Sequence, residues 1–141
     1  MSTESFRAKV ATHFAQKWAT AFPLVPVQYD NVKFKQPVDT PWVSFIVVNG
    51  DRYPTTIGKN AARRQEGIVN IAIMVPEETG TQDSNKMVDE VIKIFQELKI
   101  TVSAFARASF FDTEVRMRGN ISGYYTQNVM ISFFHDQEKQ S

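Results

Sequence analysis

The chain has 141 residues, a formal net charge of +1 at neutral pH and no cysteine. A chain of this length can bury a sizeable core, so we expect one domain over residues 1–141 that needs no covalent cross-link. The absence of cysteine excludes disulfides, thiolate metal sites and cysteine nucleophiles. The longest apolar runs are far shorter than the roughly 20 residues that span a bilayer, so no membrane segment is expected.

The first predicted element is a helix from Ser5 to about Phe22, which Pro23 and Pro26 end. Large apolar residues recur along it at every fourth position, and these are Phe6, Val10, Phe14 and Trp18. This spacing places them on one face, as in a helix that packs against a core.

Extended segments follow. The sequence predicts a short one at Val27–Phe34 and strands at Trp42–Val48 and Arg64–Val75. Both strands carry apolar residues at successive positions, which is typical of strands covered on both faces. Between them, Asp51–Ala62 is polar and contains proline and glycine, so we expect a long, irregular hairpin arm rather than a tight turn at Asn49-Gly50.

The second half begins with a loop at Glu77–Gln82 that offers Thr79 or Thr81 as a helix cap. A helix to about Leu98 follows, with Asp83 in its first turn. Its predicted buried stripe consists of Met87, Val88, Val91, Ile92, Phe95 and Leu98.

The rest reads as strands at Ile100–Val102, Ala106–Met117 and Tyr124–Phe134, interrupted by Gly119-Asn120 and Ser122-Gly123. Residues 136–141 form a polar tail. The predicted fold is therefore α+β, with two helices packed on a mostly antiparallel, mixed sheet. We expect Trp42, Phe45, Ile71 and Phe95 to lie in the core between the sheet and the helices.

The sequence offers little catalytic chemistry. Its two histidines, His13 and His135, belong to no closely spaced ligand set, and the glycines form no nucleotide-binding motif. His135 and Asp136 can at best form an isolated acid/base pair, for which no nucleophile is evident. We therefore predict that the protein is not an enzyme and holds no metal or cofactor.

Charge is distributed unevenly. The arm and its return are rich in cations, whereas Glu77–Glu97 carries six acids against two lysines. These regions are either separately solvated surfaces or complementary patches that meet between copies of the chain. The second interpretation assigns an assembly interface to Arg52, Tyr53, Lys59, Arg63, Arg64, Glu77, Glu78, Asp83 and Glu90. The arm is also a weak candidate for contact with nucleic-acid phosphates.

The order of elements and several spaced residues resemble the tail terminator, or tail completion, proteins of long-tailed phages. The residues that carry this resemblance are Asn31, Phe34, Pro41, Trp42, Arg64, Gly67 and Phe95. The resemblance implies a hexameric ring that caps the head-proximal end of the tail tube, stops its polymerisation and offers a docking surface to the head or neck.

The partners that the resemblance implies are further copies of the chain, the major tail tube protein, a head-completion or neck protein, and DNA that passes through the ring without sequence specificity. It also implies a place in the virion tail after assembly in the cytoplasm of the host bacterium. The alternatives are another neck or minor tail protein, a secretion-system relative, a small ligand-binding module, or an enzyme with an unrecognised site.

Overall fold

The structure is a computed structural model that describes residues 3–30, 32–54, 63–77, 81–100 and 108–137. Two helices and five strands follow one another as α1 (Thr3–Ala21), β1 (Val27–Tyr29), β2 (Trp42–Pro54), β3 (Arg63–Pro76), α2 (Gln82–Ile100), β4 (Ala108–Ile121) and β5 (Tyr124–Gln137). The strands form one sheet in the order β1-β2-β3-β5-β4. Only β1 and β2 pair in parallel, and the other neighbours are antiparallel, which confirms the predicted α+β class.

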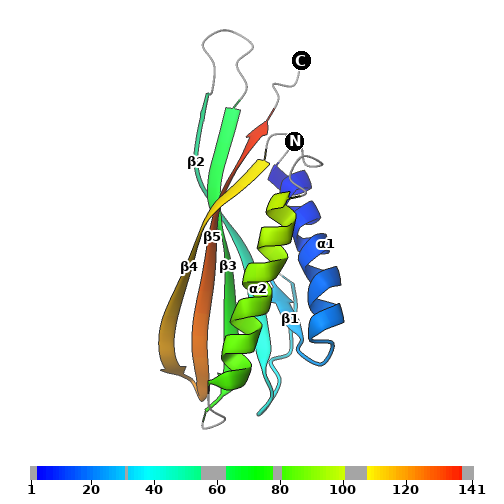
Figure 1. Cartoon of the computed structure of the whole chain (residues 1–141), viewed down its shortest axis with the longest axis vertical. Helices are drawn as coiled ribbons and strands as arrows, with labels where there is room; N and C mark the ends of the chain where they lie inside the picture. The colour runs from blue at the N-terminus through cyan, green and yellow to red at the C-terminus, as the bar shows by residue number, and fades with distance from the viewer. Residues whose placement is uncertain (1–2, 31, 55–62, 78–80, 101–107, 138–141) are drawn as a thin grey trace.

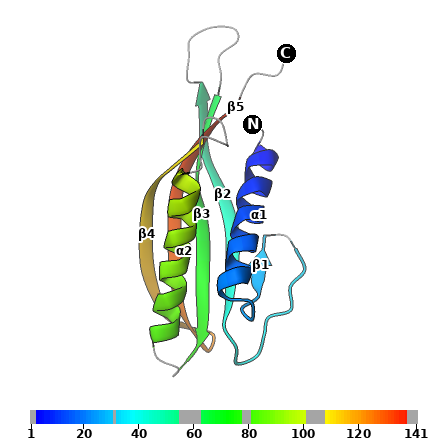
Figure 2. The ribbon, with the colours of Figure 1, turned by 45° about the vertical axis from the view of Figure 1, so that its right-hand side comes forward.

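Both helices lie on the same face of the sheet (Figures 1 and 2). Phe6, Val10, Phe14 and Trp18 are all buried, which confirms the apolar stripe predicted for α1. On α2, Met87, Val88, Val91 and Phe95 are buried as predicted, and Ile94 joins them. The sheet contributes the rest of this core through Val43, Phe45, Val69, Ile71, Ile73, Val75, Phe110, Val129, Ile131 and Phe133.

Thr81 directly precedes α2, and its carbonyl accepts a hydrogen bond from the backbone N–H of Asn85 at 2.9 Å. It therefore occupies the cap position that the sequence offered. The other candidate, Thr79, and the side chain of Leu98 lie outside the described residues.

The predicted hairpin arm is present as far as it is described. Strands β2 and β3 remain paired from Trp42↔Met74 to Pro54↔Arg63, with one register shift between Asn49 and Arg52. Asn49-Gly50 thus lies inside a strand and makes no turn. In Figure 1 the paired ends of β2 and β3 extend beyond both helices.

Gly67 lies where β3 is crowded from two sides. A Cβ atom at this position would approach the carbonyl oxygen of Val48 to 2.5 Å and the ring of Phe133 to 2.6 Å. The close approach of two neighbouring strands therefore requires glycine here.

The last two strands form a tight hairpin. Its two-residue turn is Ser122-Gly123, whose φ angles of 50° and 85° are those of a type I′ turn. Gly119 does not interrupt the strand as predicted, because it takes a φ of 74° within β4 at a register shift. The strand expected at Ile100–Val102 is wrong at its first residue, since α2 continues to Ile100 and 101–107 lie outside the described residues.

The expectation that both long strands are covered on both faces is also wrong. The face turned away from the helices leaves Val48 52% and Ile68 38% exposed. Trp42 is buried, but it lies on this same face, where its ring packs 5.5 Å from that of Phe34. Phe45, Ile71 and Phe95 lie in the helix-covered core as predicted, and Trp42 does not.

Candidate assembly surface

The sheet face opposite the helices carries apolar side chains that the described chain covers only in part. Alternation along the strands turns Ile46 and Val48 of β2, Ile68 of β3 and Met130 and Phe134 of β5 to this side. Backbone pairing places Val48 beside Ile68 and, one row along, brings Ile46 and Met130 to either side of Asn70. We call this side of the sheet, which includes these five apolar residues and Asn70, the open sheet face.

The apolar character continues onto the edge strand β4. Phe111 is 54% exposed and packs 6.0 Å from the ring of Phe134. Contiguous apolar surface of this kind marks sites of protein interaction, because its exposure to water is unfavourable.

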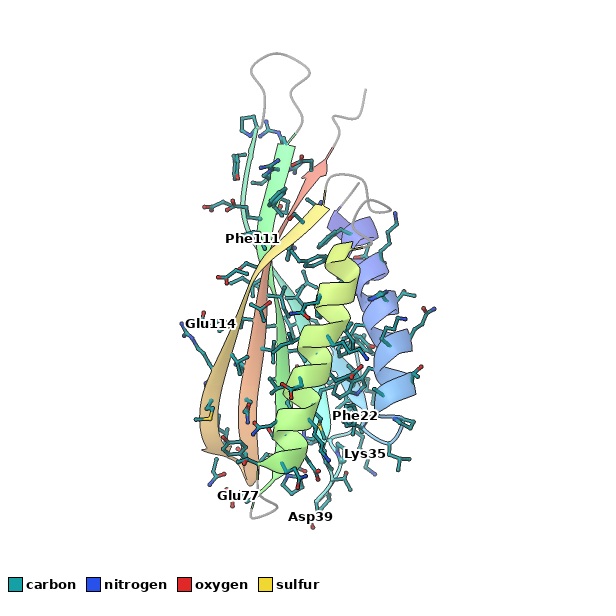
Figure 3. The ribbon with its side chains drawn as sticks, viewed as in Figure 1. Phe22, Lys35, Asp39, Glu77, Phe111 and Glu114 are labelled. Atoms are coloured by element: carbon teal, nitrogen blue, oxygen red, sulfur yellow. The ribbon has the colours of Figure 1, made fainter. Side chains whose placement is uncertain are left out.

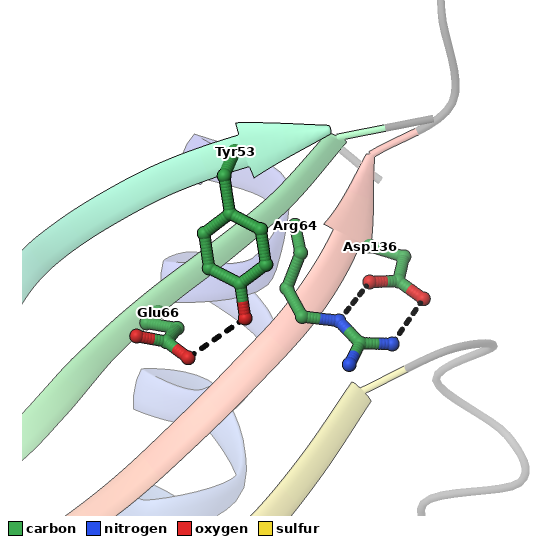
Figure 4. Close-up of polar contacts among 4 residues, drawn as sticks. All are labelled: Tyr53, Arg64, Glu66 and Asp136. Carbon is green, nitrogen blue, oxygen red and sulfur yellow. Dashed lines mark hydrogen bonds and ion pairs between the residues drawn. The ribbon is translucent and has the colours of Figure 1, made fainter. Parts of the chain in front are cut away.

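Polar contacts fasten the arm end of the open sheet face (Figure 4). Arg64 donates hydrogen bonds to both carboxylate oxygens of Asp136, at 2.8 and 3.2 Å, and its guanidinium lies 4.0 Å from the centre of the Phe134 ring. The hydroxyl of Tyr53 donates to the carboxylate of Glu66 at 2.8 Å, and this bond raises the pKa of Tyr53. Two predicted interface residues, Arg64 and Tyr53, therefore already have partners within the chain.

The other predicted cations of the arm have a different status. Arg52 and Arg63 are exposed and form no ion pair within the described part of the chain. Lys59 lies outside the described residues. Arg52 and Arg63 are therefore the described arm cations available to an outside partner.

The predicted acids lie at the other end of the molecule. Glu77 is exposed directly after β3, Asp83 is exposed in the first turn of α2, and Glu90 is half-buried about two turns further on. Glu78 lies outside the described residues. Figure 3 shows Glu77 at the end opposite the arm. The strand from Arg63 to Pro76 spans roughly 40 Å, so Arg63 and Glu77 cannot meet within one chain.

His135 and Asp136 do not form an acid/base pair. Neighbouring residues of a strand point to opposite faces, and Asp136 reaches Arg64 on the open sheet face whereas His135 is fully buried beside Phe6, with ring centres 4.3 Å apart. Burial is the main cause that lowers the pKa of His135 to about 4. The ring is therefore neutral at physiological pH and packs as an aromatic group.

Residues 3–30, 32–54, 63–77, 81–100 and 108–137 contain no group of three potential metal ligands of the His, Cys, Asp or Glu types. Neither described helix has the length and apolar character that crossing a bilayer requires.

Sequence reasoning missed the open sheet face and the partners of the arm. The available signal was the parity of positions along β3 and β5, which puts Arg64, Glu66 and Ile68 on one side with Phe134 and Asp136. Apolar residues on both sides of a strand suggested complete burial, but they also fit a surface that a partner covers.

Comparisons with known proteins point to one family. No curated protein matches the sequence. A solved structure that carries only a sequence identifier for a name matches the fold with a TM-score of 0.62 at 15% identity, over 100% of this chain and 99% of that chain. The family model described as phage tail terminator protein matches residues 5–132. The chain, a structural component of the phage tail, therefore belongs to the phage tail terminator protein family.

Proposed function

We propose that copies of this chain close into a ring that caps the head-proximal end of the tail tube, stops its polymerisation and offers a surface to the head or neck. The observation that carries this proposal is the open sheet face. A single chain leaves part of this apolar strip in water, above all Val48 and Ile68. Contact with neighbouring copies or with the tube removes that part from water.

A ring explains why assembly ends. Head-to-tail contacts between identical copies either close into a ring or continue as a filament. A closed ring satisfies the open end of the tube without presenting a new growing end. Six copies are the number that the resemblance implies, and the passage through them admits DNA without reading its sequence.

The arm supplies a second contact in this proposal. Its paired strands extend beyond the helices (Figure 2), and Arg52 and Arg63 are available there for acidic partners. In the ring, the arm of one copy contacts the acids near Glu77 of a neighbouring copy. Since these regions lie at opposite ends of the molecule, that contact requires the long axes of neighbouring copies to be offset or tilted.

Subunit contacts of this mixed kind are expected to be reversible, so the free protein is monomeric or weakly associated and closes into a ring on the tube. Sedimentation velocity across a concentration series tests the first part. Electron microscopy of purified tail tubes mixed with the protein tests the second. A ring at one end of tubes that no longer elongate is expected; unrestricted elongation with bound or unbound protein contradicts the proposal.

The arm is tested with Arg52→Glu, Lys59→Glu and Arg63→Glu combined. Arg64 is left unchanged, because its exchange would also break the pair with Asp136. We expect a folded protein that binds tubes more weakly and with an altered dependence on salt. The matched control replaces Lys9, Lys17 and Lys93 on the helices by Glu. Equal behaviour of the two triple variants removes the arm from the mechanism.

A further inference from the structure

Beside Trp42, at the end far from the arm, the outer surface of the sheet is hollowed into an open pocket of about 410 Å³. Its polar lining includes Ser44, Asn70, Thr126 and Asn128, which come from three adjacent strands. Apolar walls are formed by Trp42, Ile46, Met74 and Ile121.

Three buried polar atoms in the pocket lining have no hydrogen-bond partner within the described residues. They are the indole Nε1 of Trp42 and the amide oxygens of Asn70 and Asn128. Trp42 and Asn128 are 7% and 8% exposed, so solvent compensates these groups poorly. A buried donor or acceptor without a partner is unfavourable by about 1–3 kcal/mol. Three such atoms in one pocket therefore indicate that a ligand supplies the missing partners.

The frame of the pocket is fixed. The Tyr124 hydroxyl donates to the Pro37 carbonyl at 2.7 Å and holds the segment before β2 against the sheet. The rings of Phe34 and Tyr124 lie 5.5 and 6.3 Å from that of Trp42. Trp42 therefore packs against two rings of the same chain.

One cation lies at the pocket. Arg118 is exposed, lines the cavity and forms no ion pair within the described part of the chain. The neighbouring cation of β4 differs, because Arg116 donates to Glu114 at 2.8 Å. Arg118 thus leaves one unneutralised positive charge at this pocket.

We propose that this pocket binds an extended acidic segment of another protein of the tail. The main chain of an extended peptide presents N–H and C=O groups in alternation, which supplies donors for the two amide oxygens and an acceptor for the indole N–H. Because these atoms are buried in the free chain, binding requires their side chains to turn toward the cavity. A carboxylate of the same segment pairs with Arg118. The segment continues along the open sheet face toward Ile46 and Met130. A compact small molecule is too short to make contacts along this whole path.

This inference states which kind of segment the proposed cap binds. It rests on the proposed function only in assuming that the segment belongs to another tail protein. The bound segment belongs to a different protein and not to a second copy of this chain. Much of the acidic region of this chain is the helix α2, whereas the pocket requires an extended segment.

Asn128→Leu tests the pocket against a structural role. The Asn128 oxygen makes no bond within the described chain, so we expect an unchanged or higher melting temperature together with about tenfold weaker incorporation into tails. Gln127→Leu is the matched control on the next residue, because Gln127 donates to Asn85 on the opposite face at 3.2 Å. It should lower the melting temperature and leave incorporation normal. Normal incorporation of a folded Asn128→Leu protein overturns the inference.

Arg118 provides a test that cannot be confused with folding, since its side chain is exposed. Arg118→Glu is expected to reduce incorporation by about tenfold, and Arg118→Lys to retain most of it. Equal incorporation of the two variants contradicts the role of the charge.

A photo-crosslinking amino acid at Ile121, which lines the pocket and is 42% exposed, identifies the occupant in assembled tails. The same group at Leu24, 91% exposed and outside the pocket, is the control. Capture of a segment of another tail protein that contains Asp or Glu supports the inference. Capture of a second copy of this chain, or of nothing in infectious tails, overturns it. If wild-type protein caps tubes while all pocket variants do so equally, the pocket inference fails and the proposed function stands.

Discussion

The same strands form both faces of the sheet, but the helices cover only one of these faces. Ile71 on the helix side is fully buried, whereas Ile68, three residues earlier on the same strand, is 38% exposed on the open sheet face. One face is completed by α1 and α2, and the other is left partly exposed, with apolar and polar side chains next to one another. Together with the proposed function, the comparison predicts that folding of this chain and its assembly into the tail depend on different, interleaved residues.

The largest effect is expected on the helix side. Phe95→Ala removes a ring that is 3% exposed and packs 5.6 Å from the ring of Phe110, so it should lower the free energy of unfolding by about 3–5 kcal/mol. Urea denaturation measures this. The control is Ile68→Ala on the open sheet face, which should cost about 1 kcal/mol or less. Equal losses for the two variants would break the distinction between the faces.

The next effect depends on pH. Burial holds the pKa of His135 near 4, below that of an exposed histidine, so the unfolded chain binds the proton first as the pH falls. Above about pH 6.5 this effect does not lower the free energy of unfolding. Between pH 6.5 and 4 the free energy of unfolding falls progressively, by up to about 3 kcal/mol.

Denaturation between pH 7 and 4.5 checks this expectation against His135→Phe, which keeps an aromatic ring beside Phe6. The variant should lose much less stability than the parent over this range. The same pH dependence in both proteins would show that other groups cause it.

A smaller loss is expected at Gly67. The methyl group of Gly67→Ala meets the Val48 carbonyl and the Phe133 ring, so the strand or the ring must shift at a cost of about 1–3 kcal/mol. Thermal denaturation measures it, with Gly50→Ala as the control, because a Cβ there meets only ordinary contacts from 3.6 Å. A Gly67→Ala protein as stable as the parent would contradict the close approach of the strands.

The smallest effect is expected for the ion pair of the open sheet face. Arg64 and Asp136 are 31% and 15% exposed, and pairs with this access to water contribute about 1 kcal/mol or less. Arg64→Met should therefore change stability little and remove part of its dependence on salt. A loss as large as that of Phe95→Ala would place this pair in the folding core.

The sequence predicted the helix-covered side of the molecule well, because its signals are local. The four-residue spacing in α1 and the stripe of α2 both describe elements that bury one face. The interruption at Ser122-Gly123 was recognisable for the same reason, since glycine satisfies the positive φ of Gly123.

The open sheet face and the pocket could not be predicted in the same way. They depend on which strands become neighbours, and the pairing of Arg64 with Asp136 joins residues 72 positions apart. Trp42 shows the limit most clearly. A large apolar residue beside buried neighbours indicates burial, but its side of the sheet follows only from the register with Met74.

The most direct test of the open sheet face uses Ile68→Lys and Leu24→Lys, which place the same charge on two exposed apolar positions. After circular dichroism has shown that both proteins are folded, each complements a phage that lacks this gene, and tail lengths are measured by electron microscopy. We predict overlong tails without heads for Ile68→Lys and tails of normal length with heads for Leu24→Lys. Normal, headed tails for folded Ile68→Lys would contradict the account.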